Sequence, residues 1–153
     1  YLGEQRPSRA NFRIQQDQEN QNIMKTSVAS SAAAANAWGA LLNSGTIECR
    51  TGAAPATTAD AATGTLLGTL TFGNPAFATT ATRAITANAI TQDSSADANG
   101  TIGYVRCKTS GGVAQADMSV GVGSGECQFN SLVATTGLPI SFTSMVITFP
   151  DGA

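Results

Sequence analysis

Histidine is absent from this chain of 153 residues, and its absence removes the commonest general base and the commonest metal ligand of proteins. A Ser-His-Asp or Cys-His arrangement is therefore impossible. The only lysines, Lys25 and Lys108, belong to no recognisable catalytic motif, and the ten acidic residues are scattered. Almost any two of them could be selected as a carboxylate pair, so such a pair carries no information. We predict a non-enzymatic chain with no catalytic residue, no cofactor and no metal site.

Charge is scarce, since only 12% of the residues are charged and the formal net charge is −2. No block of Lys or Arg would attract a phosphate backbone, which argues against nucleic-acid binding. Apolar runs reach only about five residues, far short of the ~20 that a membrane span needs, so no membrane partner is expected. Ala, Thr, Gly and Ser dominate the rest, and such a surface has few long side chains to immobilise when it is covered. This favours burial in an assembly, although a soluble domain of low charge would look the same.

The three cysteines, Cys49, Cys107 and Cys127, are odd in number and contain no CxxC pair. Dispersed cysteines without histidine form neither a disulfide framework nor an ordinary zinc set. We predict buried free thiols that act as small apolar residues, and a single disulfide between two of them is the alternative. Free thiols agree with assembly in a reducing cytoplasm.

Residues 1–24 differ in composition from the rest and form a polar N-terminal arm in our interpretation. Residues 1–23 carry six of the eighteen charges and most of the glutamines. With few apolar side chains, the arm cannot offset the entropy lost on ordering by itself. We expect the arm to become ordered against a neighbouring subunit, anchored by Phe12, Ile14 and Ile23. A floppy tail is the alternative.

Residues 25–153 are predicted to form a single domain that opens with an amphipathic helix at about 26–43. Thr26 or Ser27 can cap its start, and the run of alanines has high helix propensity. Gly45 suits a left-handed conformation that ends the helix. One side of the helix should carry the apolar residues, with Trp38 as its anchor: Val28, Ala34, Ala35, Trp38, Leu41 and Leu42.

The sequence after Gly45 alternates between strand patterns and Gly-rich turns. About seven strands are expected, at 46–50, 65–72, 84–91, 101–109, 113–122, 126–133 and 138–149, with a long loop at 51–64. The last strand changes its apolar phase, which requires a bulge near Thr143 and Ser144 or a handover between sheets. The fold class predicted is mainly β, a β-sandwich or jelly-roll-like domain preceded by one short α-helix and an extended N-terminal arm. Its core should rest on Trp38, Leu66, Leu70, Phe72, Val105, Phe142, Ile147 and Phe149.

Three segments could be mistaken for binding sites. The alternating oxygen-bearing residues of 93–100 resemble the start of a calcium loop but lack its distal acid, so we expect a turn. The glycines of 121–125 lack the lysine and the helix of a phosphate-binding loop, so we expect a hairpin turn. Tyr104, Arg106 and Lys108 share one face of a strand, which we interpret as a solvated face and not as a base-stacking platform.

Four collinear segments, 46–55, 61–77, 87–106 and 130–150, together with the helix that leads into 41–45, are similar to a known family. They resemble small virion-associated proteins of tailed bacteriophages, over about residues 25–150. Members often have an aromatic residue near position 104, as Tyr104 is here, and usually begin close to Met24. The resemblance brings no catalytic residue.

The resemblance implies a virion structural protein that assembles in the host cytoplasm and is located in the virion. We expect a capsid cement or decoration protein that binds the outer shell and reinforces capsomer contacts. Its partners would be the major capsid protein and copies of itself, in a homo-oligomer or bound to the lattice. One alternative is a tail, baseplate or fibre component. Another, from a different class, is a glycan-binding module that contacts the host surface.

Overall fold

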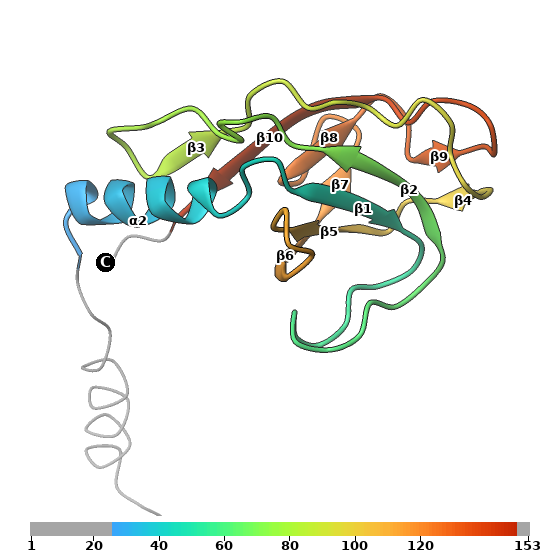
Figure 1. Cartoon of the computed structure of the whole chain (residues 1–153), viewed down its shortest axis with the longest axis horizontal. Coiled ribbons are helices and arrows are strands. Elements are labelled where there is room, and N and C mark those ends of the chain that lie inside the picture. Colours follow the sequence, from blue (N-terminus) through green and yellow to red (C-terminus); the bar gives the residue numbers. More distant parts are fainter. Residues whose placement is uncertain (1–25, 150–153) are drawn as a thin grey trace, which may run out of the picture.

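A computed structural model describes residues 26–149 of the chain (Figure 1). The predicted arm at 1–24, with its anchors Phe12, Ile14 and Ile23, lies outside the described residues. The arm therefore remains a prediction.

The described part is mainly β with one short helix, as predicted. Two four-stranded sheets have the orders β2-β1-β5-β6 and β3-β10-β8-β7, and β4 pairs with β9 in a third, two-stranded sheet. The elements are α2 (Val28–Ala40), β1 (Thr46–Arg50), β2 (Leu66–Thr71), β3 (Ala84–Thr86), β4 (Gly100–Thr101), β5 (Tyr104–Lys108), β6 (Ala114–Met118), β7 (Val120–Gly121), β8 (Cys127–Phe129), β9 (Val133–Ala134) and β10 (Phe142–Thr148).

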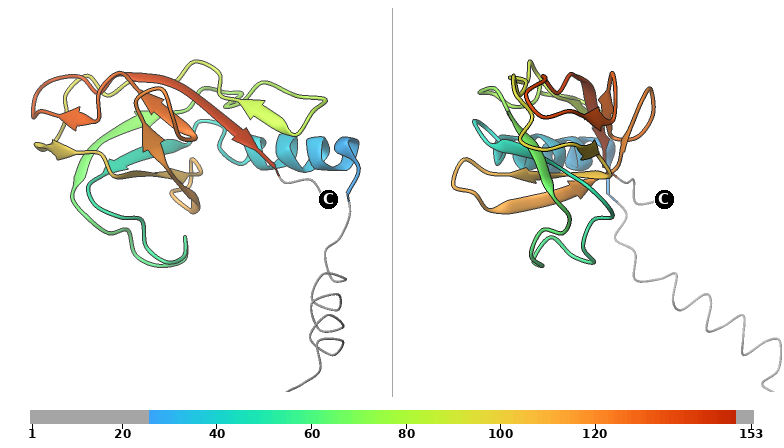
Figure 2. Two further views of the ribbon diagram at one scale, coloured as in Figure 1. Left: turned by 180° about the vertical axis from the view of Figure 1, so that it is seen from behind. Right: turned by 90° about the vertical axis from the view of Figure 1, so that its right-hand side faces the viewer.

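The two larger sheets form two layers with the apolar core between them, and α2 lies beside β3 at one end (Figures 1 and 2). Within 26–149 no helix has the length and apolarity needed to cross a membrane. The largest fully buried side chains come from both layers: Phe129, Leu42, Ile47, Leu67, Leu70, Ile85, Ile102, Met145 and Val105. This arrangement is that of a β-sandwich, in which each sheet turns one face inward.

More strands are present than the seven expected, because the chain passes between sheets inside three of the predicted strands. The segment 101–109 divides at Gly103, whose N–H donates to the carbonyl of Arg50 over 2.8 Å. A Cβ at Gly103 would lie 2.0 Å from the carbonyl oxygen of Gly52, so only glycine fits this crossing. The predicted strand 113–122 is likewise divided at Ser119 into β6 and β7. The predicted strand 126–133 is divided into β8 and β9.

The helix begins as predicted but ends differently. Ser27 is the N-cap, and its side chain accepts the backbone N–H of Ser30 over 3.1 Å. The left-handed residue after the helix is Ser44, with φ of 56°, and not Gly45. Gly45 is needed for another reason, since a Cβ there would lie 2.1 Å from the carbonyl oxygen of Lys108.

The buried face of α2 is narrower than predicted and is made of small residues. Val28, Ala34 and Leu41 are exposed, so their assignment to this face was wrong. The buried residues of the helix and the turn that follows are Ser31, Ala32, Ala35, Gly39 and Leu42. Small residues let the helix approach the sheets closely. Trp38 is half-buried and packs on Phe77 and Phe149, with ring centroids 5.9 Å away in each case.

Most of the predicted core is present, with one shift of phase. Leu70, Phe72 and Val105 are buried, whereas Trp38, Phe142, Ile147 and Phe149 are half-buried at the margin of the core. Leu66 is only half-buried, and Leu67 is fully buried in its place.

A bulge in β2 explains why Leu67 is buried and Leu66 is not. Cys49 of β1 lies opposite Gly68, but the next residue, Arg50, lies opposite Leu66. Leu67 is therefore an extra residue in β2, and a bulge reverses which face the following side chains occupy. The predicted bulge in the last strand is also present, because the register shifts between Phe142 and Ser144.

Candidate interaction face

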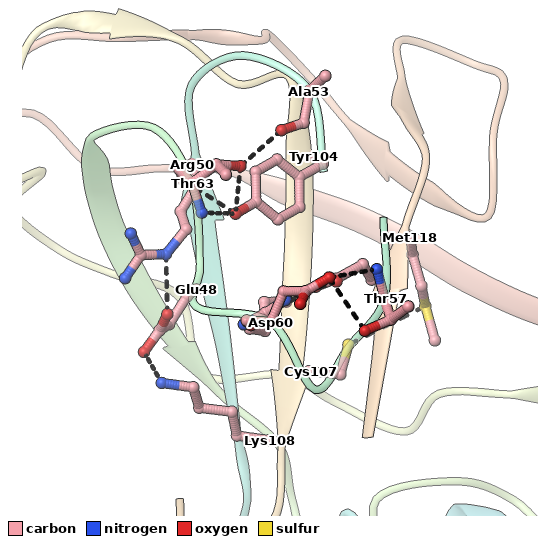
Figure 3. Close-up of polar contacts among 12 residues, drawn as sticks. Glu48, Arg50, Ala53, Thr57, Asp60, Thr63, Tyr104, Cys107, Lys108 and Met118 are labelled. Carbon is pink, nitrogen blue, oxygen red and sulfur yellow. Dashed lines mark hydrogen bonds and ion pairs between the residues drawn. The ribbon is translucent and has the colours of Figure 1, made fainter. Parts of the chain in front are cut away.

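The outer face of the sheet β2-β1-β5-β6 is covered by the loop 51–64 (Figure 3). Tyr104 of β5 fastens the loop from below. Its hydroxyl donates to the carbonyl of Thr63 over 2.9 Å and accepts the backbone N–H of the same residue over 3.0 Å. The hydroxyl of Thr63 in turn donates to the carbonyl of Ala53 over 2.6 Å, which joins the two arms of the loop. These hydrogen bonds attach the loop to the strand beneath it.

Arg106 of β5 makes the second attachment. Its guanidinium contacts both carboxylate oxygens of Asp117 on β6, each over 2.7 Å, and donates to the backbone carbonyl of Asp60 over 2.8 Å. Arg106 is only 3% exposed, and the hydrogen bonds that it donates to Asp117 raise its pKa although burial lowers it. A bidentate pair of this kind fixes geometry as well as charge.

Glu48 of β1 connects two more cations on the same face. It accepts from Arg50 over 2.9 Å and from the ammonium group of Lys108. Burial alone would raise the pKa of Glu48, but the hydrogen bonds and charges of Lys108 and Arg50 together outweigh it and lower the pKa. Arg50 also donates to the carbonyl of Gly64 over 3.3 Å, which attaches the end of the loop.

We name this cluster the charged face. It is formed by Glu48, Arg50, Asp60, Arg106, Lys108 and Asp117. The other charged residues of 26–149 are only Arg83, Asp93, Asp97 and Glu126. A chain with little charge thus concentrates most of the charge of its described part beneath and beside one loop.

The prediction that Tyr104, Arg106 and Lys108 form a solvated face was wrong. Tyr104 and Arg106 are buried, and Lys108 is half-buried. The alternation did place the three side chains on one face, but the loop 51–64 covers that face. Asp117 was overlooked: regular pairing outward from a 110–112 turn would place Ala116 opposite Arg106, and only the register shift between Cys107 and Lys108 brings Asp117 there.

A groove of about 540 Å³ lies between the loop and the β5–β6 hairpin. Its lining residues are Thr58, Ala59, Asp60, Arg106, Lys108, Gly112, Val113 and Ala114. The carboxylate of Asp60 is exposed and, among the described residues, accepts only from the N–H and the hydroxyl of Thr57, both over 3.0 Å. No Lys or Arg of the described part pairs with this carboxylate, because Arg106 and Lys108, the two cations that line the groove, pair with Asp117 and Glu48.

The three cysteines are buried and free, in agreement with the predicted thiols. The sulfur of Met118 lies 4.0 Å from Cys107 and 3.8 Å from Cys127. Burial, with a smaller effect of Asp93, raises the pKa of Cys49 to about 12, and burial also raises the pKa of the other two thiols. A thiol that stays protonated is a poor nucleophile and a poor metal ligand.

The remaining candidate segments are structural turns. Asp93 accepts the backbone N–H of Ser95 over 2.9 Å, as expected for a turn, and that of Thr69 on β2 over 2.7 Å. The segment 121–125 forms a tight turn but not a hairpin, because β7 and β8 run parallel. Within 26–149 no group of three or more His, Cys, Asp or Glu side chains is placed to hold a metal ion.

No protein-family model, curated protein or solved structure matches the chain significantly.

Proposed function

We propose that the chain is a virion structural protein of the capsid cement or decoration type, which binds the outer shell and reinforces capsomer contacts. The observation that carries the proposal is the charged face: among the described residues, Arg106 and Asp117 form an ion pair that is almost fully buried, and Glu48, Arg50 and Lys108 are half-buried in ion pairs. The residues that the described part leaves exposed are mainly Ala, Thr, Ser and Gly. Covering charged groups costs desolvation free energy, whereas covering small neutral groups costs little.

The attachment of the loop 51–64 supports the same proposal. Long loops without secondary structure are commonly functional, and here Tyr104, Arg106 and Arg50 hold the loop from three positions. A loop that is already ordered loses little conformational entropy when a partner covers it. The partners would be the major capsid protein and further copies of the chain, with the N-terminal arm reaching a neighbouring subunit.

The aromatic residues favour an assembly function over glycan binding. Sugar recognition commonly uses exposed aromatic rings, but every aromatic side chain of the described residues is buried or half-buried. The large hydrophobic residues that are exposed in this part are all aliphatic: Val28, Leu41, Val113, Val122, Val133, Leu138 and Val146.

A copy count per purified particle tests the proposal. The amount of this protein is measured by mass spectrometry with isotope-labelled peptides, against the major capsid protein in the same particles. A ratio near one to one, or another simple lattice fraction, supports the cement function. A ratio of a few copies per hundred overturns it and moves the protein to the tail, baseplate or fibre. Absence from washed particles, together with binding on a glycan array, would favour the host-surface module.

A further inference from the structure

We propose that the free edge of β6 and the adjacent groove bind residues 11–15 of the N-terminal arm from a neighbouring copy, as an added fifth strand. This inference rests on the proposed function, because it names the contact by which copies would be linked. It assigns a receptor on the domain to the arm.

β6 is the open edge of its sheet. At the opposite edge, β2 is covered by the segment that follows β3: Thr71 and Thr91 exchange backbone hydrogen bonds of 3.0 and 2.9 Å, and Asp97 donates to the carbonyl of Leu67 over 2.8 Å. Among the described residues no strand pairs with the outer side of β6. The edges of the other large sheet, β3 and β7, have only three and two residues, whereas β6 has five. A free edge of this length is a template for pairing with another chain.

The arm contains one segment with the alternation of a strand. Residues 11–15 read Asn-Phe-Arg-Ile-Gln, so Phe12 and Ile14 fall on one face and Arg13 falls on the other. Their number equals the number of residues in β6. Strand addition supplies affinity through main-chain hydrogen bonds and specificity through alternate side chains.

The two faces beside β6 match the two faces of the arm segment, since one is apolar and the other is polar. On the core side of β6, Ala116 is half-buried and Met118 is buried, and Val120 of β7 also packs against the core, so this side is apolar, as Phe12 and Ile14 are. On the outer side, the groove contains the carboxylate of Asp60, which pairs with no Lys or Arg of the described part, whereas Arg106 and Lys108, which also line the groove, are already paired with Asp117 and Glu48. Arg13 is the charged residue of the segment, and its sign is opposite to that of Asp60.

The chain length permits contact between copies. Ile14 lies twelve positions before Thr26, the first described residue, and this stretch extends at most about 40 Å. If each arm bound its own domain, the copies would remain unlinked. Binding to the next copy joins domains head to tail, as a lattice-bound protein requires.

A charge exchange at Arg13 and Asp60 tests the proposal in the full-length chain. Arg13→Glu and Asp60→Arg are each expected to weaken self-association about tenfold or more, measured by analytical ultracentrifugation at low salt. An equimolar mixture of the two variants is expected to associate again, because each arm then meets a groove of opposite charge on the other variant. Arg9→Glu makes the same charge change outside the segment and is expected to associate like the unmodified chain.

Each other outcome overturns the proposal. A monomeric unmodified chain at high concentration, or unchanged association of both variants, excludes the contact. The double variant Arg13→Glu/Asp60→Arg combines both changes in one chain. If it restores the protection of β6 from hydrogen exchange while the mixture of single variants does not associate, each arm binds its own domain. Thermal unfolding checks that Asp60→Arg folds normally, and Phe12→Ser provides an independent loss of the contact. These solution experiments test the contact between the arm and β6, whereas the copy number per particle tests the cement proposal. Failure of the one is therefore distinguishable from failure of the other.

Discussion

Removing the carboxylate of Asp117 should destabilise the domain strongly, because it leaves the guanidinium of Arg106 covered and without its ion-pair partner. The two side chains are 4% and 8% exposed, and both hydrogen bonds between them are 2.7 Å long. Breaking a buried ion pair by removing one partner typically costs roughly 3–5 kcal/mol. The pair lies under one loop and not between the two sheets, so the cost should fall at the lower end of this range. We therefore expect Asp117→Ala to lower the free energy of unfolding by about 3 kcal/mol.

A double variant distinguishes the cost of leaving a charge unpaired from the cost of losing a side chain. In Arg106→Met/Asp117→Leu no charge is left unpaired, and replacing both partners of a buried pair by apolar groups is often nearly neutral. The double variant should therefore recover all but about 1 kcal/mol. Arg50→Met removes a more exposed partner, since Arg50 and Glu48 are 16% and 13% exposed, and should cost at most about 1 kcal/mol.

Urea unfolding followed by far-ultraviolet circular dichroism measures these differences, and Asp117→Ala should lower the Tm by about 10 °C. A loss below about 1 kcal/mol for Asp117→Ala would refute the argument that the loop shields the pair from water. A double variant as unstable as the single one would show that the loop needs the hydrogen bond from Arg106 to Asp60 more than it needs a paired charge.

Three further perturbations probe the charged face and the core. The folded-state pKa of Glu48 lies below its ordinary value of 4.5. Its contribution to the free energy of unfolding is therefore complete above that pH and is lost as the pH falls through the folded pKa. When unfolding is measured as a function of pH, Glu48→Gln should lose less stability in acid than the unmodified protein. Tyr104→Phe removes the hydroxyl that bonds Thr63 and should cost about 1 kcal/mol and speed limited proteolysis within 51–64. The three thiols should not react with an aromatic disulfide reagent in the native domain, but all three should react in denaturant.

Each of these three predictions has an outcome that would contradict it. An acid titration that is identical for Glu48→Gln and the unmodified protein would show that another carboxylate, such as Glu126, whose pKa Ser119 lowers, dominates acid unfolding. Proteolysis of Tyr104→Phe at 110–112 as fast as within the loop would indicate global loosening. Rapid labelling of a native thiol would contradict the burial of the cysteines.

Local signals in the sequence determined several features correctly. The bounds of β1, the N-cap at Ser27, the bulge before Ser144 and the mainly β class with one helix all follow from patterns within a few residues. Alternation, capping and phase are properties of neighbouring residues. They need no knowledge of which distant segment lies beside them.

The tertiary structure decided which faces are covered. Tyr104 and Arg106 are buried by residues 41 and 46 positions away, Thr63 and Asp60, and no local pattern shows where the loop 51–64 lies. The crossing at Gly103 depends on the close approach of Gly52 in the same way. Burial is a property of the pair of surfaces in contact, and the sequence of one strand specifies only one of them.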